Sequence, residues 1–115
     1  MGQTATISRN NTSIRSGTDN EGRATLTVRL HSTDVVTLTM LGARYRHALA
    51  VTLNSGGWRT VTTKARINQV AHEYRLPFRV QQDRGQWYVS YDSPRRFNVT
   101  VEFEDGLTFP VVGSI

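Results

Sequence analysis

The sequence predicts an α+β fold: an antiparallel sheet of about six short strands, with one amphipathic helix at about residues 62–75 packed on one face. Three observations support this. Apolar and polar residues alternate in several short runs, which is typical of half-buried strands. Short, turn-prone segments join these runs, which favours antiparallel neighbours. One stretch has a helical period instead, and a helix with one apolar stripe must bury it against another element.

Alternation begins at Thr25, and three runs follow before residue 54. In the first, the apolar side chains of Leu26, Val28 and Leu30 share one face. The segment HSTD (31–34) separates the first run from the second, and a loop opened by Gly42 separates the second from the third. With such short connections, the runs predict an antiparallel meander. The three predicted strands are residues 25–30, 36–40 and 49–53.

The helix is predicted after the segment NSGG (54–57), which ends the third run. Thr62 or Thr63 can cap its N-terminus, because threonine hydroxyls accept bonds from the first free amides. Pro77 stops it, because the residue before a proline is pushed out of helical dihedral angles. The apolar residues spaced i, i+3, i+4 and i+7 form one stripe: Ile67, Val70, Ala71 and Tyr74.

Alternation returns after the helix. Phe78 and Val80 start a strand, QDRGQ (82–86) is a hairpin turn, and WYVSY (87–91) is the return strand. Residues 97–103 then alternate strictly, and Asp105-Gly106 is a strong turn signal into a last strand.

The length of 115 residues suits one compact domain. Residues 1–24 show no sustained period and are predicted to be a flexible N-terminal arm with room for one short edge strand, so residues 25–115 form a single α+β domain. Cysteine is absent and the three histidines are scattered, so we expect no metal and no cofactor. No apolar run approaches the roughly 18 residues of a membrane helix, and the N-terminus has no apolar signal core, which favours a cytosolic protein.

The net charge of +5 is unevenly distributed. Residues 44–96 carry ten cations against three carboxylates, a net +7, whereas residues 97–115 carry three carboxylates and no cation. Thirteen of the fourteen cations are arginine, which favours bidentate contacts with phosphate or carboxylate, and aromatic residues lie among them, as in proteins that stack on bases. A merely solubilising surface remains the alternative interpretation.

The stretch LNSGGWRTVTTKARIN (53–68) is the strongest candidate for a binding site. Helix N-termini bind anions through unpaired amides, and cations such as Lys64 in the first turn oppose the helix dipole unless an anion intervenes. The spacing is not that of a Walker A loop. The alternative is a glycine turn and a threonine cap, with Trp58 as a lid on the core. The predicted anion or nucleic-acid site comprises Ser55, Gly56, Gly57, Trp58, Arg59, Thr60, Thr63, Lys64 and Arg66, with help from Arg44, Arg46 and Arg79.

His31 and Asp34 are the candidates for acid–base chemistry, because an aspartate can orient a histidine as a general base. No nucleophile or further acid accompanies them in the sequence, and Asp and Ser in a turn more often bind backbone amides. We therefore predict no catalytic residue and no enzyme activity.

Three segments together resemble a group of small proteins encoded by tailed bacteriophages: LHSTDVVTLT (30–39), VTLNSGGWRTVTTKARIN (51–68) and QWYV (86–89). The similarity covers about residues 28–106. The chain departs from the group in its longer, basic loop LGARYRH (41–47) and in having Ala65, not an acidic residue, before Arg66. The resemblance implies expression in an infected bacterium and supplies no activity.

We therefore expect a non-enzymatic phage accessory protein that binds nucleic acid or a phosphate-bearing ligand through the basic loop and helix start. The alternative is a protein-interaction module that binds and modulates a host protein, in host takeover or anti-defence. A small hydrolase using His31 and Asp34, or a virion part, is a weaker hypothesis. We expect the protein in the cytoplasm of the infected host, without a membrane partner. A homodimer through a strand edge is compatible with the sequence.

Overall fold

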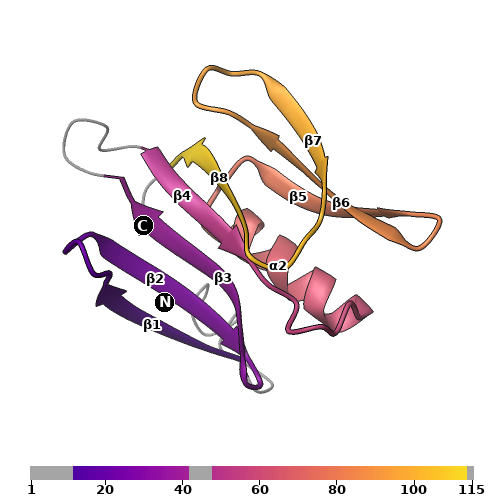
Figure 1. The fold of residues 1–115 in the computed structure, drawn as a ribbon, viewed down its shortest axis with the longest axis horizontal. Coiled ribbons are helices and arrows are strands. Elements are labelled where there is room, and N and C mark those ends of the chain that lie inside the picture. Colours follow the sequence, from indigo (N-terminus) through magenta and orange to yellow (C-terminus); the bar gives the residue numbers. More distant parts are fainter. Residues whose placement is uncertain (1–11, 42–47, 114–115) are drawn as a thin grey trace.

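The computed structural model describes residues 12–41 and 48–113, and in these residues it has eight strands and one helix. The strands form two antiparallel sheets (Figure 1), a five-stranded sheet in the order β1-β2-β3-β4-β8 and a three-stranded sheet in the order β5-β6-β7. The elements are β1 (Thr12–Thr18), β2 (Ala24–Leu30), β3 (Thr33–Met40), β4 (Ala48–Leu53), α2 (Val61–Glu73), β5 (Phe78–Asp83), β6 (Gln86–Asp92), β7 (Asn98–Glu102) and β8 (Leu107–Val112).

The predicted fold class is wrong in its architecture. We expected one sheet of about six strands with a helix on one face, but the described chain is mostly β, with eight strands divided between two sheets. The division arises because β8 returns to pair with β4, with Leu107 opposite Leu53, and leaves β5 to β7 as a sheet of their own. Alternation shows which residues face a core, but it does not show which strands become neighbours.

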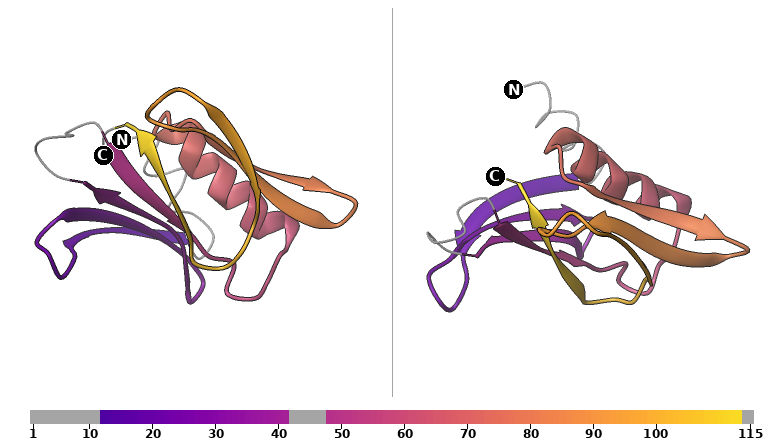
Figure 2. Two further views of the ribbon diagram at one scale, coloured as in Figure 1. Left: turned by 45° about the horizontal axis from the view of Figure 1, so that its top comes forward. Right: turned by 90° about the horizontal axis from the view of Figure 1, so that it is seen from above.

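Helix α2 lies against one face of the five-stranded sheet and beside the three-stranded sheet (Figure 2). It contacts β5, β3 and β2 and buries Ile67 and Val70 completely. Its N-cap is Thr60, whose side chain accepts a bond from the Thr63 amide, so the cap precedes the two threonines that the sequence suggested. In the part of the chain that the structure describes, no helix is long and apolar enough to cross a membrane.

One side chain of the helix also closes the edge of the second sheet. The Asn68 amide donates to the Val80 carbonyl at 3.0 Å and accepts from the Val80 amide at 2.7 Å. Val80 lies in β5, whose other edge pairs with β6. Asn68 therefore takes the place of a neighbouring strand at this residue and fixes the helix against β5.

Aromatic contacts join the two sheets. Phe109 of β8 packs edge-on against Phe78 of β5, with ring centroids 5.5 Å apart, and stacks on Tyr91 of β6 at 4.4 Å. Within the smaller sheet, Trp87 of β6 and Phe103, which follows β7, form a further edge-on pair at 5.3 Å. Phe78, Phe109, Trp87 and Phe103 are all buried, so the sheets share one hydrophobic core.

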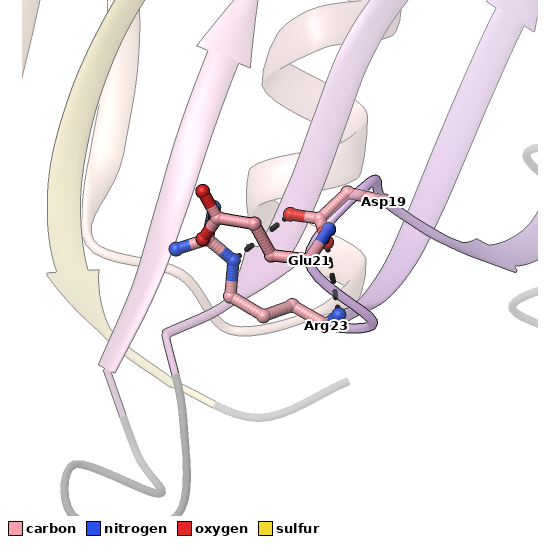
Figure 3. Close-up of polar contacts among 3 residues, drawn as sticks. All are labelled: Asp19, Glu21 and Arg23. Atoms are coloured by element: carbon pink, nitrogen blue, oxygen red, sulfur yellow. Dashed lines mark hydrogen bonds and ion pairs between the residues drawn. The ribbon is translucent and has the colours of Figure 1, made fainter.

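Within the predicted N-terminal arm, for which the sequence left room for one short edge strand, residues 12–18 form the edge strand β1 and residues 19–23 form the turn into β2; residues 1–11 lie outside the described residues. The turn into β2 is built on Asp19, whose carboxylate accepts bonds from the Glu21 and Arg23 amides, both at 2.9 Å (Figure 3). The Arg23 guanidinium binds the same carboxylate at 2.9 Å and Glu21 at 2.9 Å. These bonds lower the pKa of Asp19 despite the opposing effect of desolvation, with the Arg23 amide as the largest cause.

Candidate functional site

The glycine corner between β4 and α2 does bind a carboxylate, and that carboxylate is the chain's own. Asp105 accepts bonds from the Ser55 amide and the Ser55 hydroxyl, both at 2.7 Å, and from the Gly57 amide at 3.2 Å. The Gly56 amide donates to the Asn54 side chain at 2.8 Å. The amides of three residues of the predicted site, Ser55, Gly56 and Gly57, are therefore already bonded within the molecule.

The pKa of Asp105 is shifted both by partial burial and by these hydrogen bonds. Partial burial alone raises the pKa, but the bonds from Ser55 and Gly57, with the nearby charge of Arg59, outweigh it and hold the pKa below the ordinary carboxyl value. The ionised carboxylate is thus the form that fits the corner. Ser55 is only 2% exposed, so Asp105 satisfies polar groups that water does not reach.

The cations at the start of the helix bind neutral acceptors instead of carboxylates. Arg59 donates to the Phe103 carbonyl at 3.2 Å and lies over the Phe103 ring, 5.2 Å from its centroid. Lys64 donates to the Gln82 side chain at 3.0 Å. Arg66 donates to the Thr12 hydroxyl at 3.2 Å and to the Gln69 side chain at 3.0 Å. Within residues 12–41 and 48–113, all the ion pairs belong to Arg15, Arg23 and Arg29, so the charges near the helix start stay uncompensated at contact distance.

An open pocket of about 410 Å³, here called the Trp58 pocket, lies beside the N-terminus of α2. Trp58 forms part of its wall and is 72% exposed, so the prediction of Trp58 as a lid on the core is wrong. Leu30 and Val35 are buried and form its apolar side, while the remaining lining is rich in hydroxyl groups. The lining residues are Leu30, His31, Ser32, Thr33, Val35, Ser55, Trp58, Thr60, Thr62 and Thr63.

Backbone geometry brings the two walls of this pocket together. One wall is the β2–β3 turn, where His31 has a positive φ of 55°. The other is the loop 54–60, where Gly56 has a φ of 65° and lies so close to Thr33 that an added Cβ would overlap the threonine side chain. Two separate features therefore favour glycine at residue 56: the positive φ and the close approach of the Thr33 side chain.

The structure gathers only part of the predicted site. Ser55, Trp58, Thr60 and Thr63 line the Trp58 pocket. Arg79 lies elsewhere, in a groove of about 600 Å³ that it shares with His72 and Arg75 near the C-terminal end of α2. Arg44 and Arg46 lie outside the described residues.

The two candidates for acid–base chemistry do not form a pair. Asp34 binds the Arg29 guanidinium at 2.8 Å and the Arg15 guanidinium at 3.3 Å, while His31 lines the Trp58 pocket. In the part of the chain that the structure describes, no three His, Asp or Glu side chains gather as a metal site.

The sequence pattern does not reveal two of the residues that shape this corner. Asp105 was interpreted only as a turn residue, although it lies 50 positions from the Ser55 that it binds. Thr33 was assigned only to the turn-prone segment before the second strand, and its contact with Gly56 gave no signal in the sequence. Only the contrast between the basic residues 44–96 and the acidic residues 97–115 indicated that a carboxylate from the end of the chain could bind near the helix start.

Comparison with known proteins gives one match. No curated protein and no solved structure matches the chain. A family model described as "Kyanoviridae Gp96 protein" matches residues 1–110. At the level of the family, this confirms the resemblance to tailed-bacteriophage proteins. Because the match spans almost all of the 115 residues, the chain belongs to the Kyanoviridae Gp96 protein family.

Proposed function

We propose that this phage protein is a non-enzymatic accessory factor that binds single-stranded nucleic acid, with one base held in the Trp58 pocket. The exposed Trp58 ring carries the proposal, because it stands as a free aromatic wall beside a pocket with an apolar side and several hydroxyl groups. A base stacked on an exposed aromatic ring gains roughly 1–3 kcal/mol, and hydroxyl groups can bond to its polar edge.

Arg66 supplies the phosphate contact in this proposal. Its guanidinium binds Thr12, and Thr12 pairs with Leu30, which lines the pocket, so we expect the charge of Arg66 to reach a phosphate attached to the bound base. Both acceptors of Arg66 in the described chain are neutral, so an incoming phosphate would meet an uncompensated cation. The glycine corner plays no part in phosphate binding here, because Asp105 fills it. We place this activity in the cytoplasm of the infected bacterium.

Intrinsic fluorescence provides a direct test, because the chain has two tryptophans and the second, Trp87, is only 2% exposed. Titration with a short single-stranded oligonucleotide should quench Trp58 and leave the Trp87 emission as an internal reference. Trp58→Ala should weaken binding by roughly 5- to 150-fold, the loss of one stacked base, and Trp58→Phe should weaken it less, because phenylalanine still stacks. Both variants should fold normally, since the ring is exposed.

Salt dependence tests the role of Arg66. The affinity should fall steeply with salt, because phosphate neutralisation releases counterions. Arg66→Ala should weaken binding to all sequences and reduce the slope of log affinity against log salt by about one unit. The proposal fails if the affinity is flat between about 50 and 200 mM salt, or if Trp58→Ala binds as well as the wild type.

A second function is favoured by one further observation. Val61 is 77% exposed and follows Trp58 closely in the chain, so two large apolar side chains lie in water at the start of α2. Exposed tryptophan beside apolar residues is typical of protein interfaces. The partner would be an acidic host protein, because Lys64 and Arg66 in the same helix have no carboxylate within contact distance in the described chain.

A matched pair of substitutions separates the two functions. Val61→Ser should weaken capture of a protein partner from nuclease-treated host lysate, yet leave oligonucleotide binding nearly unchanged. Val112→Ser removes an apolar side chain that is 48% exposed on β8 and should change neither. If Val61→Ser and Val112→Ser give the same capture, the protein-interaction hypothesis is contradicted.

A further inference from the structure

The outer edges of the two sheets are not equally protected against pairing with another strand. An open edge presents free backbone amides and carbonyls, and proteins usually block it. On β5, Asn68 binds both backbone groups of Val80. On β8, Pro110 removes an amide donor. On β1, the central residue is Arg15, so antiparallel pairing of two β1 strands about their middle would oppose two positive charges.

Strand β7 has none of these protections. Its sequence NVTVE has no proline and no cation, and in the described chain its pairing partner is β6 alone. The Phe103 amide bonds to the Trp87 carbonyl, so the odd-numbered residues of this segment bond toward β6. Because bonding direction alternates along an antiparallel strand, the backbone groups of Asn98, Thr100 and Glu102 point to the free edge.

We infer that β7 pairs antiparallel with β7 of a second copy of this chain, about a two-fold axis at Thr100. In this register every outward-pointing residue meets another: Thr100 opposes Thr100, and Asn98 opposes Glu102. Val99 of each copy opposes Val101 of the other, and both valines are only half-buried in the single chain. The two three-stranded sheets become one continuous six-stranded sheet.

Charge complementarity supports this occupant and this direction. The exposed turn before β7 carries Arg95 and Arg96, and the segment that ends and follows it carries Glu102 and Glu104. Among the described ion pairs, none involves these four side chains. Antiparallel pairing places the arginines of each copy beside the glutamates of the other, twice by symmetry. Parallel pairing would place arginine beside arginine.

The apolar contribution comes from the face that β7 shares with Phe97. Phe97 is 67% exposed at the start of the strand, in line with Val99 and Val101. A five-residue edge is smaller than a standard interface, so the dimer should be weak, concentration-dependent and weakened further by salt. The interface uses no residue of the Trp58 pocket, so this inference is independent of the proposed function.

Light scattering or sedimentation equilibrium of the full chain at increasing concentration tests the inference. The wild type should pass from monomer to dimer, and Thr100→Pro should remain monomeric. The Thr100 amide points to the free edge, so its loss should spare the bonds to β6 and leave the circular dichroism spectrum unchanged. A wild-type protein that stays monomeric at about 1 mM, or a Thr100→Pro variant that dimerises normally, overturns the inference.

Charge reversal provides a second test that does not depend on proline. Arg96→Glu and Glu104→Arg should each raise the dimer dissociation constant by about tenfold, because each opposes like charges across the axis. The double variant should return to within about threefold of the wild type, because the pairs are complementary again. If the dissociation constant of the double variant rises by the product of the two single effects, these residues do not meet, and the proposed register is wrong.

Discussion

At the scale of single residues, the glycine corner contains a matched pair. Gly56 and Gly57 both have positive φ, 65° and 84°, but an added Cβ overlaps Thr33 at Gly56 and meets nothing within 4 Å at Gly57. Gly57→Ala should therefore cost only the backbone term, about 1–2 kcal/mol of unfolding free energy. Gly56→Ala should cost about 1–3 kcal/mol more, because the added methyl group also overlaps Thr33 and pushes the loop away from the start of β3. Denaturant unfolding of both variants measures the difference, and equal losses would contradict it.

The Gly56→Ala variant should also change the Trp58 pocket, because Thr33 lines it. Oligonucleotide binding should be weaker in Gly56→Ala than in Gly57→Ala when both are measured well below their unfolding midpoints. The pair thus reports on pocket geometry separately from stability.

Asp105 gives a prediction about pH. Its pKa in the folded protein is lowered: burial acts against the charged form, but the bonds from Ser55 and Gly57 and the charge of Arg59 prevail. Its stabilising contribution is therefore complete above the ordinary carboxyl pKa of about 4 and is lost as the pH falls through the lowered folded value. Asp105→Asn should lower the free energy of unfolding by about 1 kcal/mol at neutral pH, after allowance for solvent screening.

The difference in unfolding free energy between wild type and Asp105→Asn should shrink toward zero as the pH falls through the lowered pKa of the folded Asp105, where both side chains become neutral. Ser55→Ala is a useful companion, because it removes one donor to the same carboxylate at 2.7 Å. A difference that does not change with pH would show that the charge of Asp105 contributes nothing.

At the scale of elements, the contact between α2 and β5 depends strongly on Asn68. Asn68→Ala removes the partners of both the amide and the carbonyl of Val80, a residue that is almost fully buried. Leaving such groups unsatisfied costs about 1–3 kcal/mol, so this variant should be clearly destabilised. His72→Ala, on an exposed position of the same helix, should be nearly neutral. Thermal unfolding of the two variants compares them.

Hydrogen exchange adds a local measurement to this comparison. Relative to the wild type, Asn68→Ala should accelerate exchange of the Val80 amide more than exchange of the Val28 and Val36 amides in the five-stranded sheet. Uniform acceleration throughout the protein would indicate that the helix does not protect this edge separately.

The elements themselves were predictable to the extent that each has a local signal. The helical stripe is visible in the sequence, and so is the alternation of β2 and β7. The sequence leaves room for an edge strand in this segment but does not locate β1, because its seven residues include Ser, Arg, Gly and Thr, and Ile14 is its only apolar residue packed against the core. Its register is set by the Asp19 turn and by pairing with β2, which depend on contacts rather than on periodicity.

The candidate site shows the same limit. The sequence predicted that something negative belongs near the glycine corner, and Asp105 is there. It did not identify the anion, because a contact between residues 50 positions apart depends on how β8 pairs with β4. The expectation that Arg79 joins the corner ignored the length of α2: thirteen residues of helix span about 20 Å.

At the scale of the whole molecule, the fold brings the basic middle of the chain against its acidic end. Asp105 enters the corner that precedes α2, and Arg59 lies over Phe103. Part of the charge asymmetry in the sequence is thus resolved inside one molecule. Among the charges without an ion pair in the described chain are Arg95 and Arg96 before β7 and Glu102 and Glu104 at its end, and these are the ones that the proposed dimer would pair.

The cohesion of the two sheets depends on Phe109. This residue of β8 contacts Phe78 and Tyr91 of the other sheet, so Phe109→Ala removes aromatic contacts on both sides and leaves a cavity at the junction. Truncation of a buried phenylalanine costs about 3–5 kcal/mol, a large share of the stability of a domain of this size.

Beyond this loss of stability, the variant should lose cooperativity. In a Trp58→Phe background, the fluorescence of Trp87 reports only the three-stranded sheet, whereas circular dichroism reports all strands and the helix. With Phe109 intact, the two denaturant transitions should coincide, as expected for a single cooperative unit. With Phe109→Ala, the fluorescence transition should come first, because β5 to β7 then lose their aromatic contacts with β8 and depend mainly on the packing of α2 against β5. Coincident transitions in both proteins would mean that helix α2, rather than Phe109, makes the two sheets unfold together.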